Sequence, residues 1–342
     1  MNFFMMKHRQ CGLSLIELMI AMVLGLLVTL GVVNLFLTTR TVYRQNENLA
    51  RIQENARFAF EFLGREIREA GGISCGSNLP TANVLNNPET NWWSNWGDGI
   101  HGYDDTQDTF PPKRFGSNSL DRVAGTDAFV VMTSTQSDLI IITDHNPNSA
   151  QFKVNATAHG LADGDIVMVC DYRQAAIFQI TNANSSNVTI VHNTGGSVSP
   201  GNCSKGLGVP TVCTTNGTPY TFEKGGFLGR LSASAWYVGH NDRGGTSLYR
   251  VRMRNNGGSA DTITEEIVEG VTNMQVTYLV RASDGTLAND YVGAAALTPA
   301  DWPNVVAARV ALTFSSLENV GTEQQSLVRS LASVYTLRNR VP

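Results

Sequence analysis

The residues that could do chemistry in this 342-residue sequence are few and scattered. A dense acidic run offers oxygen ligands of the kind that calcium prefers, from Asp98, Asp104, Asp105 and Asp108. Only the number of carboxylates supports a calcium site, so we expect a solvated acidic loop and no bound metal. Four histidines lie near Gly, Asp or Asn and are expected at surface turns; these are His101, His145, His159 and His240.

The sequence contains no recognisable catalytic motif. It has no GxSxG elbow, P-loop, HExxH or EF-hand loop. Gly206-Leu207-Gly208 is a Gly-rich turn with no helix pattern behind it, so it does not predict a phosphate loop. We therefore expect a protein that is not an enzyme and that needs no cofactor.

The charge balance argues against a general affinity for nucleic acid. The formal net charge is -4, and charged residues make up only 16% of the sequence, so there is no broad basic field. One local basic strip consists of Arg243, Arg250, Arg252 and Arg254. We expect this strip to be the solvent face of a strand, and we infer no specific nucleic-acid partner.

The N-terminus contains the strongest signal in the sequence. Leu13 to Leu37 is a 25-residue, mostly apolar run, which is long enough to span a hydrocarbon core of about 30 Å as a helix. Lys7 and Arg9 precede it and place that side in the cytoplasm. A secretory signal peptide would be shorter and would end at a small-residue cleavage site. A plain membrane anchor leaves the intramembrane carboxylate of Glu17 unexplained.

The segment from Gly12 to Met19 resembles the type IV prepilin motif. The resemblance implies that a prepilin peptidase cuts between Gly12 and Leu13 and N-methylates Leu13, where most members of the family have Phe. Glu17 then becomes the fifth residue of the mature chain and pairs with the amine of an adjacent subunit. An ion pair within one chain, without a role in assembly, is the alternative.

The residues after Thr38 continue a helical pattern. One apolar stripe predicts that the helix runs on to Ala70 and stops at Gly71-Gly72, about 58 residues and roughly 87 Å in all. The stripe consists of Val42, Leu49, Ile52, Ala56, Phe60, Leu63, Ile67 and Ala70.

Beyond Ile73 the pattern changes to short strands and turns, which predicts an α+β protein: a long N-terminal helix packed on an antiparallel β-rich head. The expected parts are a leader (1–12), a transmembrane or fibre-core half of the helix (13–37), its amphipathic half (38–72) and the head (73–342). Within the head, about 74–218 is a loop- and β-rich elaboration, and about 219–342 is a C-terminal sheet. A tryptophan cluster in the elaboration is expected to pack over the helix, with an exposed contact patch as the alternative; it comprises Trp92, Trp93 and Trp96.

Several stretches in the same order also resemble the PilW minor pilins. They include Ala56 to Phe60, Arg65 to Gly71, Gly125 to Ala128, Cys170-Asp171, Ala176 to Thr181, Glu269 to Val271, Tyr278, Val305 to Leu312 and Leu337 to Arg340.

This second resemblance implies a subunit required for type IV pilus initiation and assembly, in a tip complex with other minor pilins. The expected partners are the other minor pilins, the major pilin, prepilin peptidase, the inner-membrane assembly platform and a tip adhesin. The expected location is the bacterial inner membrane, crossed once with the head in the periplasm, and then the surface pilus. A pseudopilin of type II secretion and a tip adhesin or DNA-contacting subunit are the alternatives.

Removal of the leader takes away Cys11 and leaves four cysteines in an exported chain, which favours disulfides. Cys170 and Cys203 flank two strand-like runs, so we prefer Cys170–Cys203 with Cys75–Cys213. A Cys203–Cys213 pair that closes a small loop is the alternative.

Overall fold

The computed structural model describes residues 14–76, 79–282, 284–321, 323 and 325–340, with the backbone alone for 135–139. The chain divides into two compact units, an N-terminal unit (1–51 and 316–327) and a head unit (52–315 and 328–342). Helix α1 (Leu15–Glu69) contributes its first part to the N-terminal unit and its last part to the head unit.

In the head unit, one side of α1 is buried as the apolar stripe predicts. Ile52, Leu63 and Ile67 are almost fully covered, whereas Val42, which the stripe also included, is 48% exposed in the N-terminal unit. The helix ends at the predicted stop signal. Gly71 adopts a φ of +70°, which a residue with a Cβ rarely does, and its N–H donates to the carbonyl of Met132 at 2.7 Å.

The strands of the head unit are β1 (Thr81–Asn83), β2 (Ile100–Tyr103), β3 (Ala128–Asn146), β4 (Gln151–Val154), β5 (Ile166–Cys170), β6 (Ala175–Gln179), β7 (Asn182–Ala183), β8 (Thr189–Val191), β9 (Phe227–His240), β10 (Thr246–Asn256), β11 (Ser259–Glu269), β12 (Val271–Val280), β13 (Val292–Gly293), β14 (Val305–Ser315) and β15 (Val328–Thr336). Short 3-10 helices are η1 (Pro88–Thr90), η2 (Ala294–Ala296), η3 (Trp302–Asn304) and η5 (Arg338–Arg340).

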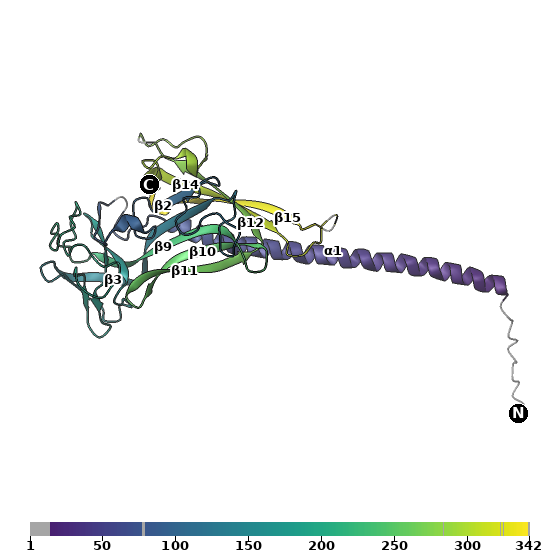
Figure 1. Ribbon diagram of the computed structural model, residues 1–342, viewed down its shortest axis with the longest axis horizontal. Helices are drawn as coiled ribbons and strands as arrows, with labels where there is room; N and C mark the ends of the chain where they lie inside the picture. Colours follow the sequence, from purple (N-terminus) through teal and green to yellow (C-terminus); the bar gives the residue numbers. More distant parts are fainter. Residues whose placement is uncertain (1–13, 77–78, 283, 322, 324, 341–342) are drawn as a thin grey trace, which may run out of the picture. The chain divides into compact units, whose positions relative to one another are not determined.

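These strands form two sheets. The larger has 11 strands, with a path β1-β6-β5-β9-β3-β4-β8-β7; β10 joins it through β9, β11 through β10, and β2 through β3. The smaller has the order β13-β12-β14-β15. Strands β9, β10 and β11 lie side by side in Figure 1. The expected division of the head into an elaboration up to about residue 218 and a separate C-terminal sheet after it is wrong. Strands β9 to β11 follow residue 218 but belong to the same sheet as β3 to β6.

The larger sheet is buried on both faces near its centre. Ile166, Met168 and Cys170 of β5 belong to one apolar cluster, while Val167 and Val169 belong to another. This explains why β5 is an unbroken apolar run without the alternation of a half-exposed strand.

The last part of α1 contacts both sheets. Glu66 accepts a hydrogen bond from the indole Nε1 of Trp236 on β9 at 2.5 Å and pairs with Arg250 on β10 at 2.9 Å. On the other sheet, the hydroxyl of Tyr335 on β15 donates to the carbonyl of Phe60 at 2.8 Å. A long helix against antiparallel sheets confirms the predicted α+β class.

Candidate functional sites

The start of α1 places Glu17 in a reciprocal cap with Ser14. The Ser14 N–H donates to Glu17 Oε2 at 3.0 Å, and the Glu17 N–H donates to Ser14 Oγ at 3.3 Å. This is the S-x-x-E capping box, which satisfies two backbone donors at a helix N-terminus. Gly12 and Leu13, the expected cleavage and methylation positions, lie outside the described residues.

Apolar side chains cover the first part of α1 on all sides and none of them is buried. Leu15 is 76% exposed, Leu26 71% and Phe36 66%. By length and composition this is one helix that could cross a membrane, found in the described part of the chain. Such a surface needs lipid or other helices around it.

The four aspartates of the acidic loop, which were expected to be solvated and not to bind calcium, do not gather at one point. Asp104 and Asp105 instead approach Asp127, and one carboxylate oxygen from each lies within 4.8 Å of the others. Asp98 is drawn away to the ring of His101, at 2.9 Å, and Asp108 accepts the backbone N–H of Phe115 at 2.7 Å. The four carboxylates weighed as calcium ligands thus do not form one cluster, because loop backbone and side-chain partners separate Asp98 and Asp108 from Asp104 and Asp105.

A buried arginine supplies the positive charge beside this cluster. The guanidinium of Arg122 donates to the carbonyls of Tyr103, Asp104, Gln107 and Thr126. Burial lowers the pKa of Arg122 to about 10, against the opposing attraction of nearby aspartates. Arg122 thus orders the acidic loop from inside, and no local pattern in the sequence indicates that this particular arginine is buried.

Asp127 joins the two sheets of the head. Its backbone N–H donates to the carbonyl of Met274, and its Oδ2 accepts the N–H of Val276 at 2.7 Å, both on β12. Burial, together with Asp104 and Asp105, raises the pKa of Asp127 to about 6. Its Oδ1 is buried and has no hydrogen-bond partner among the residues that the structure describes.

The arginine strip on β10 and its preceding turn is neutralised by carboxylates. Arg250 pairs with Glu66 and with Glu265, and Arg252 also pairs with Glu265. The two outer residues are likewise paired, Arg243 with Glu266 and Glu269, and Arg254 with Asp261. The strip is therefore a set of cross-strand ion pairs rather than a basic surface.

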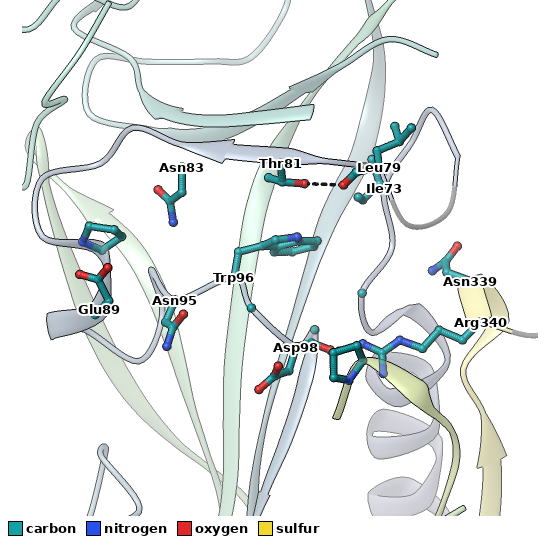
Figure 2. A pocket seen from close by; sticks show the side chains of 15 residues that line it. Ile73, Leu79, Thr81, Asn83, Glu89, Asn95, Trp96, Asp98, Asn339 and Arg340 are labelled. Atoms are coloured by element: carbon teal, nitrogen blue, oxygen red, sulfur yellow. Dashed lines mark hydrogen bonds between the residues drawn. The ribbon is translucent and has the colours of Figure 1, made fainter. Parts of the chain in front are cut away.

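The three tryptophans were predicted to pack over the helix, but they pack on the larger sheet. Trp93 is buried in the cluster that contains Met132 and Tyr237, and Trp92 and Trp96 lie partly buried against the same cluster. Figure 2 shows Trp96 in a cavity between Thr81 on one side and Asp98 on the other. Arg340 closes one flank, where its guanidinium donates to the carbonyls of Asp98, Trp302 and Val305.

Two of the histidines predicted at surface turns are buried. His159 is 2% exposed, and His145 lies inside β3 at 7%. Its Nε2 lies 3.3 Å from Nε2 of His192, a fully buried residue that the sequence analysis did not single out. The neighbouring Asn, Asp and Gly residues suggested turns, but Phe152 and Phe222 enclose the His145 ring.

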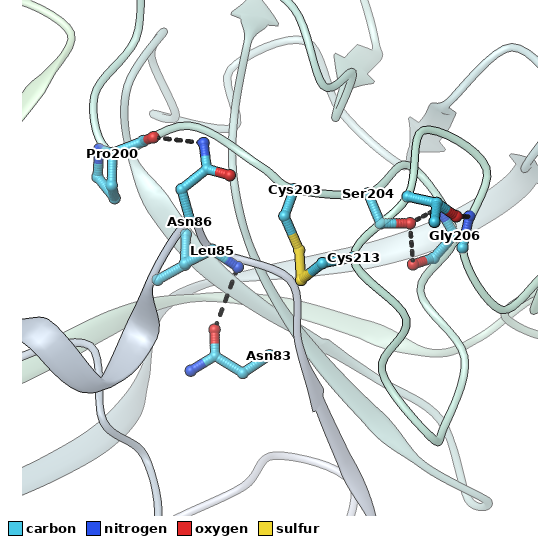
Figure 3. Close-up of a disulfide and its surroundings, with 10 residues drawn as sticks. Asn83, Leu85, Asn86, Pro200, Cys203, Ser204, Gly206 and Cys213 are labelled. Carbon is cyan, nitrogen blue, oxygen red and sulfur yellow. Dashed lines mark hydrogen bonds between the residues drawn. A yellow bond between two sulfur atoms is a disulfide. The ribbon is translucent and has the colours of Figure 1, made fainter.

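The preferred disulfide pairing was wrong. The structure pairs Cys75 with Cys170 across 95 residues and Cys203 with Cys213 across 10. Figure 3 shows the smaller loop beside Leu85 and Asn86, where the Cys203 N–H donates to the Val84 carbonyl. Residue 203 is thereby held at β1 and its flanking segment, while Cys170 at the end of β5 meets the segment that follows α1.

Two known families match this chain. Residues 235–337 match the family described as PilW, Type IV Pilus-assembly protein W. Residues 7–33 match the Prokaryotic N-terminal methylation motif, and this range contains Gly12, Leu13 and Glu17. No curated protein matches the sequence.

Proposed function

We propose that this chain, a type IV pilus minor pilin of the PilW family, helps to initiate and assemble the pilus within a complex at its tip. The observation that carries the proposal is the start of α1. A capping box that contains Glu17 stands at the head of a helix whose apolar side chains are uncovered on all sides.

The helix surface defines two successive environments. Each large apolar side chain gains roughly 1.5–3 kcal/mol when it leaves water completely, so the segment Leu15–Leu37 is stable only in lipid or among other apolar helices. We infer that it spans the inner membrane first, with the head in the periplasm. It then lies among the helices of neighbouring pilins in the fibre.

Cleavage after Gly12 would create an amine at Leu13, next to the cap. In the single chain Glu17 accepts a hydrogen bond from the Ser14 N–H. In the fibre the amine of the next subunit can replace that N–H, which gives an ion pair between subunits. A desolvated carboxylate is costly unless it is paired. This gives an incoming subunit a reason to stop at one axial position.

The proposed partners follow from this route. Prepilin peptidase and the inner-membrane assembly platform act on the membrane-inserted form. Other minor pilins and the major pilin surround the helix in the fibre, and a tip adhesin would meet the head. The role is structural, with no catalytic step assigned to the chain.

The test is complementation of a clean gene deletion, with sheared surface pili and the secreted proteome measured together. We expect the intact gene to restore pili, and Glu17→Ala or Gly12→Val to fail, with Gly12→Val still carrying its leader by mass spectrometry. Glu47→Ala is the matched control, because Glu47 is an exposed glutamate of the same helix that pairs with Arg51 at 2.8 Å.

Loss of secretion with pili intact would reassign the chain to a type II pseudopilus. Restoration of pili by Glu17→Ala at the level of the intact gene would contradict the role given to the carboxylate. A normal chain in which Gly12 remains attached to Leu13, in cells with active prepilin peptidase, would contradict the processing.

A further inference from the structure

Two neighbouring cavities open in the head unit beside the tryptophan loop. The first has a volume of about 420 Å³ and the second about 320 Å³. Both lie within the range of roughly 300–1,000 Å³ that is typical of small-molecule sites. Four residues line both cavities, Glu89, Asn95, Asp98 and Gly99, so the two are adjoining parts of one cleft.

The walls of this cleft are held in place from several directions. The amide of Asn83 donates to the Ser94 carbonyl at 2.7 Å, and the Ser94 hydroxyl contacts the Pro88 carbonyl at 2.6 Å. On the other flank, Arg340 donates to the Asp98 carbonyl. A ligand would therefore meet a largely preformed site and would not have to order the loop itself.

Each cavity contains aromatic surface. Trp96 lines the first, while Trp92 and Tyr103 line the second. Both tryptophans are only partly buried against the core of the larger sheet, so part of each indole is left for a ligand. Figure 2 shows Trp96 at the centre of the first cavity, with polar side chains around it.

The shared residues carry hydrogen-bonding groups that the fold does not use. In the described part of the chain, the side chains of Glu89 and Asn95 make no hydrogen bond or ion pair, and both are exposed. Asp98 uses one carboxylate oxygen for His101. The cleft thus offers carboxylate acceptors and an amide, which is both donor and acceptor, between two aromatic surfaces.

This pattern selects a class of ligand. The faces of a pyranose ring present C–H groups that pack on an aromatic ring, while its edges present hydroxyls that donate to carboxylates and accept from amides. An anionic ligand is disfavoured by Glu89 and Asp98. Arg340 also lines the first cavity, but its guanidinium already donates to three backbone carbonyls, which leaves it fewer donors for an anion.

We propose that this cleft binds a neutral oligosaccharide. One sugar ring lies on Trp96 and another on Trp92, and their hydroxyls hydrogen-bond to Glu89, Asn95 and Asp98 between them. The proposal goes beyond the assembly function and does not depend on it, since all of these residues belong to the head unit and none lies in the processed helix. It gives the enlarged loop region between α1 and β3 a binding role.

The experiment uses the full-length processed chain in a zwitterionic detergent, because alkyl-glycoside detergents would themselves offer sugar rings to the cleft. The probe is an array of neutral, acidic and amino oligosaccharides, followed by calorimetric titration of the strongest neutral binder. We expect Trp96→Ala and Trp92→Ala each to weaken binding about tenfold or more. Tyr172→Ala is the matched control, because Tyr172 is an aromatic residue 67% exposed on the turn between β5 and β6.

Two further variants keep the test independent of folding. Glu89→Gln and Asn95→Ala change exposed side chains that have no partner in the described part of the chain, so they should leave thermal unfolding unchanged and still weaken binding several-fold. Binding of no neutral oligosaccharide, or equal binding by all four cleft variants, would overturn the proposal. Preferential binding of a lysine-rich peptide or an amino sugar would overturn it too, in favour of a cationic ligand held by the carboxylates and indoles.

Complementation separates this proposal from the assembly function. The deletion strain that carries Trp96→Ala should form pili normally while its purified subunit fails to bind the saccharide. Loss of pili together with an intact saccharide affinity would contradict the separation of the two roles.

Discussion

The rings of His145 and His192 contact each other, and a backbone N–H determines which ring nitrogen of each histidine carries the proton. The N–H of Phe222 donates to Nδ1 of His145 at 3.0 Å, so this nitrogen carries no proton and Nε2 does. Nε2 of His145 then donates to Nε2 of His192, which puts the proton of His192 on Nδ1. Both rings are therefore neutral in the folded head, and a proton added to either accepting nitrogen breaks a hydrogen bond.

This contact makes the head sensitive to acid. Burial lowers the pKa of His145 to about 4 and that of His192 to about 3. The unfolded chain binds protons at both histidines below about pH 6.5 and the folded chain does not, so stability is present above that pH and is lost as pH falls toward 4. When the pH is lowered from 6 to 5, we predict that the free energy of unfolding of the double variant His145→Asn/His192→Gln falls by about 2 kcal/mol less than that of the original protein.

The measurement is the free energy of denaturant unfolding of the full chain at each pH. Comparison of the two proteins is essential because Asp127, whose pKa is raised to about 6, acts with the opposite sign and is present in both. Asn and Gln keep an acceptor near the original nitrogen. Equal pH slopes for the two proteins would show that the histidines take up protons in the folded head.

At the scale of elements, α1 packs closely on the smaller sheet at Gly64. A Cβ at this position would lie 2.4 Å from Cε1 of Tyr335 on β15. Glycine inside a helix costs about 1 kcal/mol relative to alanine, so propensity alone favours replacement. The ring of Tyr335 explains why the fold requires glycine there.

We predict that Gly64→Ala destabilises the head by about 1–2 kcal/mol, because the overpacking cost exceeds the gain in helix propensity. Gly31→Ala is the matched control in the same helix, since a Cβ there has nothing within 4 Å. Thermal unfolding of the head, followed by near-ultraviolet circular dichroism, measures both. Tyr335→Leu should reduce the cost of Gly64→Ala in a double-mutant cycle, and full additivity would contradict the contact.

The elements themselves were largely predictable from local pattern. Gln151–Val154 and Ile166–Cys170 match β4 and β5, because apolar runs between turn residues identify strands directly. Phe129–Met132 and Leu139–Thr143 by themselves predict two strands but form one, β3, because β9 pairs with it on both sides of an irregularity, through Ala128–Thr135 and again through Ile140 and Ile141. The three-residue β1 was missed, because its pairing partner β6 lies about 90 residues away along the chain.

The candidate sites were less predictable than the strands. The capping box follows from the S-x-x-E spacing of Ser14 and Glu17 at the start of the apolar run, so it is a local signal. The burial of Arg122 and the His145–His192 contact depend on which strands meet, and no local pattern reports that. The same limit produced the wrong disulfide pairing.

For the molecule as a whole, the two disulfides close loops of very different length and are expected to stabilise the fold by different amounts. Cys75–Cys170 closes 95 residues that include β1 to β4 and the Trp92–Trp96 wall of the cleft, and it ties the segment after α1 to the centre of the larger sheet. Cys203–Cys213 closes 10 residues within one loop region. If loop closure in the unfolded chain dominates, the first contributes roughly 4–5 kcal/mol and the second roughly 2.5–3 kcal/mol.

We therefore predict that Cys75→Ala/Cys170→Ala destabilises the head by about 2 kcal/mol more than Cys203→Ala/Cys213→Ala does. Guanidinium unfolding of the full chain in detergent measures both free energies, and the reduced original protein serves as the reference for losing both bonds. Equal costs would mean that local packing around the sulfur atoms outweighs the length of the closed loop. A larger cost for the short loop would mean that Cys203, held to β1 through the Val84 carbonyl, anchors the edge of the larger sheet more strongly than Cys170 anchors its centre.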